Sequence, residues 1–108
     1  HPFGGVTRPG INDAKILRHI DAIEVLNGGT LMKQNSQAFT LARRLKKPMT
    51  SSSDAHLLKN VGKFACAIDA DNINSILNDI KNGKIRLPKK TTSYLGVVTD
   101  KLRRGLRL

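Results

Sequence analysis

Residues 22–56 read AIEVLNGGTLMKQNSQAFTLARRLKKPMTSSSDAH, and this stretch decides the fold. Residues 22–26 form an apolar run typical of a buried strand, and residues 49–52 form a second, shorter strand candidate. Between them, residues 31–46 have the spacing of an amphipathic helix. Its apolar stripe consists of Ala38, Leu41, Ala42 and Leu45. A strand, a helix and a strand in this order predict a parallel βαβ unit.

The rest of the chain extends the alternation of strands and helices. The predicted elements are a short helix after Asn12 or Asp13, strands at 64–68 and 85–87, a helix at 73–81 and a marginal amphipathic helix at 93–108. We therefore predict the α/β class, in which functional sites lie at the carboxyl ends of parallel strands.

The composition fits one domain with a modest core. The chain has 108 residues, of which 39% are hydrophobic, and a net charge of +11 from 19 basic and 8 acidic residues. This charge attracts phosphate-bearing partners, either nucleic acid or an anionic substrate, but it also fits a piece whose acidic half is missing. Aromatic residues make up only 4%, which argues against a surface of stacked bases.

No signal peptide and no apolar run of membrane-spanning length are present. The single cysteine, Cys66, is predicted to be a buried core thiol, and it excludes an intrachain disulfide. We therefore expect a cytoplasmic protein that does not contact a membrane.

Asp54 and His56 follow directly after the predicted strand at 49–52. In an extended chain, side chains two residues apart point to the same side, so a carboxylate and an imidazole can converge there. His1 could add a third ligand from another strand end, and such mixed oxygen and nitrogen donors suit Zn, Mn or Fe. The alternative is a capping Asp54 beside an ordinary loop His56. Glu24, in the middle of a strand, is expected to have a structural role.

Several segments together resemble one known family. They are HPF at 1–3, DAIEVLNG at 21–28, Asn35 with Ala38 and Leu41-Ala42, PMTSSSDAH at 48–56, and Val61-Gly62. In order and spacing, roughly residues 1–70 resemble the C-terminal half of the PHP (polymerase and histidinol phosphatase) family.

The resemblance implies a distorted (β/α)7 TIM-like barrel, with its C-terminal half at residues 1–90. The spacing of apolar and basic residues predicts that residues 91–108 form a basic, helical C-terminal tail. It also implies a metal-dependent phosphoesterase that hydrolyses phosphate esters with two or three divalent metal ions (Zn, Mn or Fe). By the same resemblance, His1, Asp54 and His56 are metal ligands, and Asp54 and His56 are catalytic. Arg8, in the loop after His1, is a candidate for binding the substrate phosphate.

Part of the family's ligand set has no counterpart here, namely its early His-x-His motif and its middle His and Glu ligands. We therefore expect this chain alone to be inactive, and to pair with the missing N-terminal half of the barrel or with a second copy of itself. The expected substrate is a phosphorylated small molecule or nucleotide.

Two other functions fit the sequence. One is a basic RNA-binding protein with a PHP-like barrel that has lost catalysis, similar to the protein subunit of ribonuclease P. The other is a regulatory or assembly fragment that is stable only beside a partner.

Overall fold

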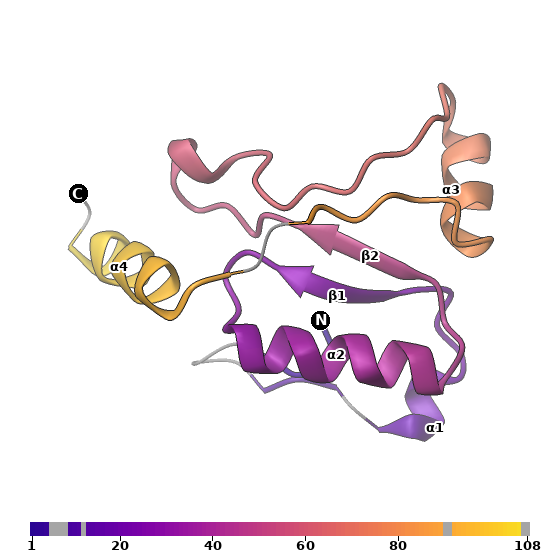
Figure 1. Cartoon of the computed structure of the whole chain (residues 1–108), viewed down its shortest axis with the longest axis horizontal. Coiled ribbons are helices and arrows are strands. Elements are labelled where there is room, and N and C mark those ends of the chain that lie inside the picture. Colours follow the sequence, from indigo (N-terminus) through magenta and orange to yellow (C-terminus); the bar gives the residue numbers. More distant parts are fainter. Residues whose placement is uncertain (5–8, 12, 90–91, 107–108) are drawn as a thin grey trace.

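The computed structural model describes residues 1–4, 9–11, 13–89 and 92–106. This part of the chain is a mixed α/β domain with two parallel strands and four α-helices (Figure 1). The elements are α1 (Ala14–Leu17), β1 (Ile23–Asn27), α2 (Met32–Arg44), β2 (Met49–Ser52), the 3₁₀ turn η1 (Leu58–Asn60), α3 (Ile73–Lys81) and α4 (Tyr94–Gly105). Two strands do not close a barrel within these ranges.

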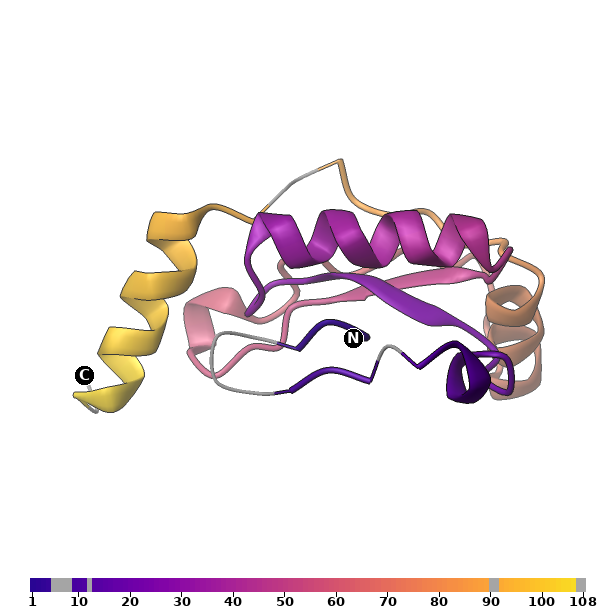
Figure 2. The same cartoon turned by 90° about the horizontal axis from the view of Figure 1, so that it is seen from below.

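The predicted βαβ unit is confirmed. β1 and β2 pair in parallel, and α2 is the crossover between them. Figure 2 shows α2 on one side of the strands and the N-terminal segment on the other. The core forms where Ile23 and Val25 of β1 pack against Ala38 and Ala42 of α2, because the small alanines let the helix approach the sheet closely.

A bulge interrupts the pairing of β1 with β2. The register runs from Glu24 opposite Thr50 directly to Leu26 opposite Ser51, so Val25 has no partner on β2. An extra residue of this kind changes which side chains share a face of the strand, and bulges are common beside functional sites. The bulge at Val25 lies two residues before Asn27, where β1 ends.

The strands predicted at 64–68 and 85–87 are wrong. The two segments share only one antiparallel bridge, between Ala67 and Arg86. Gly62 and Phe64 both have positive φ, so the chain turns where the first strand would begin. An apolar run needs backbone partners along its whole length to form a strand, and only one residue pair finds them here.

The predicted helices at 73–81 and near the C-terminus form as α3 and α4. The side chain of Asn72 caps α3 by accepting a hydrogen bond from the backbone N–H of Ser75 at 2.9 Å. The hydroxyl of Ser93 caps α4 by accepting one from the backbone N–H of Gly96 at 3.1 Å. α3 and α4 lie at opposite ends of the molecule (Figure 1).

Cys66 is only half-buried, not the core thiol that was predicted, because its segment does not join the sheet. Within the described ranges, the helices are too short or too polar to cross a membrane.

One buried amide joins β1, α2 and the chain before α4. The side-chain Oδ1 of Asn35 accepts from the backbone N–H of Asn27 at 3.0 Å. Its Nδ2 donates to the backbone oxygen of Asn27 at 3.2 Å, to that of Thr30 at 3.4 Å and to Thr92 Oγ1 at 3.1 Å. Asn35 is 7% exposed, so water cannot readily replace a hydrogen bond that one of these groups loses.

We expect Asn35→Ala to lower the free energy of unfolding by roughly 2–4 kcal/mol, because it leaves several buried backbone groups without a partner. Gln37→Ala is the matched control, since Gln37 is exposed on the same helix. Urea denaturation of both variants measures the difference. Equal stability of the two variants would contradict the role given to Asn35.

Candidate functional site

A cavity of about 250 Å³ lies at the ends of β1 and β2. Its walls come from four separate parts of the chain: the N-terminal segment, the end of β1, the segment after β2, and α4. The lining residues are His1, Gly4, Pro9, Glu24, Asn27, Gly29, Thr30, Asp54, His56, Lys101 and Arg104. The structure therefore brings His1 to the same cavity as Asp54 and His56, which lie about 50 residues further along the chain.

Asp54 and His56 are adjacent, but not for the reason expected from the sequence. Asp54 has a φ of 45°, so the chain is not extended there. Instead, His56 folds back, and its Nδ1 lies 2.8 Å from the backbone oxygen of Asp54 and 3.8 Å from Oδ1. A carbonyl can only accept, so Nδ1 carries a hydrogen in this contact and Nε2 of His56 is left with its lone pair. In metal sites, a backbone oxygen often holds one ring nitrogen in this way and leaves the other nitrogen to bind the ion.

His1 is almost fully buried in the cavity wall, with 5% of its side chain exposed. Its Nδ1 accepts a hydrogen bond from the backbone N–H of Phe3 at 3.3 Å, while its Nε2 is buried without a partner. An orphaned nitrogen beside a cavity fits a missing ligand. In the neutral ring, however, the Phe3 contact places the hydrogen on Nε2, so binding a metal through Nε2 requires that contact to be given up.

Glu24 also lines the cavity, which sequence reasoning missed. Its Oε1 accepts a hydrogen bond from Ser52 Oγ, and its Oε2 accepts one from Asn27 Nδ2 at 3.1 Å. The clue in the sequence was the acid between Ile23 and Val25, which had to face away from the core. The expected structural role fits these contacts, and the position adds a second carboxylate to the cavity.

Two glycines let the chain after β1 approach the chain after β2. A Cβ on Gly28 would lie 2.5 Å from the backbone oxygen of Ser53, and a Cβ on Gly29 would lie 2.6 Å from Asp54 Oδ2. Real Cβ atoms do not approach that closely, so any side chain at Gly29 would displace the Asp54 carboxylate. The Gly28-Gly29 pair therefore sets the position of Asp54.

The wall formed by α4 was also missed, because residues 91–108 were treated as a tail. Val97, Lys101 and Arg104 are spaced for one helix face, with Val97 buried and the two cations at the cavity. Asp100 fixes the helix to η1, since it lies 2.8 Å from Lys59 Nζ and accepts from Asn60 Nδ2 at 2.6 Å. The hydrogen bond from Lys59 is the main reason that the pKa of Asp100 is below its ordinary value.

The metal site expected from the sequence is not complete in this part of the chain. No three His, Cys, Asp or Glu side chains among the described residues lie close enough together to hold a metal ion. The donor types fit a divalent transition metal, but further ligands are needed, and His1 would have to give up its contact with Phe3 to bind through Nε2. Arg8, the expected phosphate ligand, lies outside the described residues.

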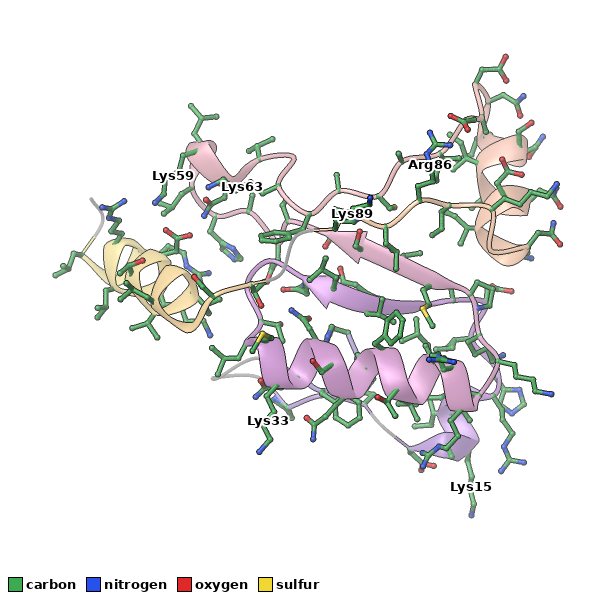
Figure 3. All side chains as sticks on the ribbon, viewed as in Figure 1. Lys15, Lys33, Lys59, Lys63, Arg86 and Lys89 are labelled. Atoms are coloured by element: carbon green, nitrogen blue, oxygen red, sulfur yellow. The ribbon has the colours of Figure 1, made fainter. Side chains whose placement is uncertain are left out.

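Four of the six cations labelled in Figure 3, Lys15, Lys33, Lys59 and Arg86, lie on separate parts of the chain, whereas Lys63 lies beside Lys59. Lys47, which follows α2, has a structural role, because its Nζ donates to the backbone oxygens of Arg18 and Ile20, both at 2.8 Å. RNA binding stays a prediction.

Comparison with known proteins gives one match. Residues 33–85 match a family model described as PHP-associated. The matched region runs from α2 to the segment after α3, and it includes Asp54 and His56 but not His1. No curated protein and no solved structure matches the chain significantly.

The pKa of Asp100 predicts how α4 responds to acid. A carboxyl whose pKa is lowered by folding stabilises the protein above its unfolded pKa of about 3.9, and that stability is lost as the pH falls further through the folded value. We expect wild type to be more stable than Asp100→Asn at pH 6, by less than about 1 kcal/mol because the pair is partly exposed. The difference should shrink below about pH 3.9.

Urea denaturation at pH 6, 4 and 3 measures this difference. Asp21→Asn serves as the control, because Asp21 lies on the surface with 70% of its side chain exposed, 3.6 Å from Lys81. A gap between wild type and Asp100→Asn that stays constant down to pH 3 would contradict the assignment.

Proposed function

We propose that this chain supplies part of a metal-dependent phosphoesterase, because residues 33–85 match a family model described as PHP-associated. In this proposal Asp54, His56 and His1 are ligands in a site with more than one divalent metal ion, since the three side chains do not lie close enough together to share one ion. The observation that carries it is the cavity at the strand ends, which Asp54, His56 and His1 line together. The family is generally associated with hydrolases.

The contacts within the cavity support metal binding by His56. Its Nδ1 is held by the backbone oxygen of Asp54, so the lone pair of Nε2 is the one available to a ligand. Asp54 contributes a carboxylate, which occupies the space that a side chain at Gly29 would fill. A bound Zn, Mn or Fe ion would lower the pKa of water and polarise a phosphoryl oxygen. The residues of this chain would hold and orient that ion.

The second carboxylate of the cavity has a supporting role in this proposal. Glu24 accepts hydrogen bonds from Ser52 and Asn27, which hold it at the end of β1. Its negative charge favours the binding of a cation in the cavity, as does that of Asp54. Glu24 is thus an electrostatic neighbour of the ion and not one of the proposed ligands.

The remaining ligands must come from outside the described residues. We propose that the chain completes a PHP-type barrel together with further strands, either from an N-terminal half or from another copy. The apolar side chains of α1 and of the segment before it support this, because Ile11 and Ile16 are 60% and 51% exposed beside an open hollow of about 320 Å³. The phosphorylated substrate would enter the cavity that the completed barrel encloses.

The first test is Asp54→Asn in the full-length protein. Asn tolerates the positive φ of this position and keeps the size of the side chain, but it removes the charge. We expect metal-dependent phosphatase activity to fall at least about 1000-fold, with bound metal reduced in elemental analysis. Asp21→Asn is the control, and an Asp54→Asn protein with wild-type turnover would refute the assignment.

The second test moves Asp54 without replacing it. Gly29→Ala places a methyl group against Asp54 Oδ2 and displaces the carboxylate. We expect metal affinity to fall by roughly tenfold, as it does when a group that orients a metal ligand is lost. Gly105→Ala, which meets no atom within 4 Å, is the matched control. Titration with Co²⁺, followed by its absorption spectrum, measures affinity directly. Equal Co²⁺ affinity in the two variants would show that Asp54 does not bind the metal.

A further inference from the structure

Two cations of α4 face the same cavity as Asp54 and His56. Lys101 and Arg104 both line it, and both are half-buried although they belong to a surface helix. We propose that this pair binds the phosphoryl group of the substrate and selects a terminal phosphate monoester over an internal diester. This inference rests on the proposed function for the reaction, and it assigns the substrate class.

The position of the two cations is fixed by the way α4 docks. Val97, four residues before Lys101, is 5% exposed and anchors the same helix face. Asp100 is held by Lys59 and Asn60 on η1, which stops the helix from rotating about its axis. The packing of Val97 and the ion pair between Asp100 and Lys59 therefore together keep Lys101 and Arg104 at the cavity.

The positive charges of α4 are not neutralised by its own acid. Asp100 is the only acidic residue of the helix, and it is paired with Lys59. Among the described residues, neither Lys101 nor Arg104 lies within 4.0 Å of a carboxylate oxygen. Within the cavity, Glu24 is already hydrogen-bonded to Ser52 and Asn27. The two cations are therefore available to an anion.

Charge balance distinguishes the two classes of phosphate ester. A monoester carries close to two negative charges at neutral pH, because its second pKa is about 6. A diester carries one charge and presents two free oxygens instead of three. Arg104 can hold two phosphate oxygens through its planar fork, and Lys101 can bind a third as a point charge. A diester would leave one cation without its partner.

The test compares p-nitrophenyl phosphate with bis(p-nitrophenyl) phosphate in the metal-loaded full-length protein. For Lys101→Met/Arg104→Met we expect kcat/KM for the monoester to fall roughly 100-fold, and that for the diester to fall no more than about tenfold. Arg103→Met is the matched control, because Arg103 is exposed on the same helix and does not line the cavity. Equal losses for the two esters, or none beyond the control, would overturn the inference.

A second variant separates charge from packing. Lys101→Arg/Arg104→Lys keeps both charges, so it should retain the preference for the monoester, whereas a purely structural role would make it as defective as the methionine pair. An unchanged urea midpoint for each variant confirms that α4 remains docked. Loss of the preference in the charge-retaining variant would also overturn the inference.

Calorimetric titration with inorganic phosphate tests the inference apart from catalysis. Wild type and Arg103→Met should bind phosphate with similar affinity, and Lys101→Met/Arg104→Met should bind it at least about tenfold more weakly. If neither ester is hydrolysed, the proposed function fails, but this titration still decides whether α4 holds phosphate. Equal phosphate affinity in all variants, or no binding by wild type, would refute it.

Discussion

The buried amide of Asn35 is the constraint on which the rest of the structure depends. Its side chain forms hydrogen bonds with the backbone N–H and the backbone oxygen of Asn27, where β1 ends. It also donates to the backbone oxygen of Thr30 and to the hydroxyl of Thr92. A short two-stranded sheet has little hydrogen bonding of its own and needs packing or further contacts to be stable. One amide thus fixes the end of β1, the turn that precedes α2 and the chain that leads into α4, and two of its partners, Asn27 and Thr30, also line the cavity.

The site follows from this arrangement through two local features of β1. The bulge at Val25 changes the alternation of side chains, so that Glu24 shares the cavity with Asn27 while Leu26 turns to the opposite side. The Gly28-Gly29 turn then lets the chain after β2 come close enough for Asp54 to join them. The polar cavity and the apolar core are therefore two sides of the same irregular strand.

The basic residues have different roles in different parts of the fold. The net charge of +11 is spread over separate elements, and part of it is used inside the fold, as Lys47 and Lys59 show. Two cations of α4, Lys101 and Arg104, line a cavity that also contains carboxylates and imidazoles. A phosphate in the cavity would interact mainly with Lys101 and Arg104, because solvent and salt screen the charges that lie further away.

The sequence by itself determined the βαβ unit, the ends of the helices and the candidate pair Asp54 and His56, because periodicity, caps and strand ends are local properties. It failed for the strands at 64–68 and 85–87, since an apolar run becomes a strand only if a partner chain lies along it. The bulge, the roles of Glu24 and Asn35, and the cations of α4 were decided only by the tertiary structure. Each depends on contacts between segments far apart in the chain, such as Asn35 with Thr92, and spacing along the sequence cannot encode where those segments meet.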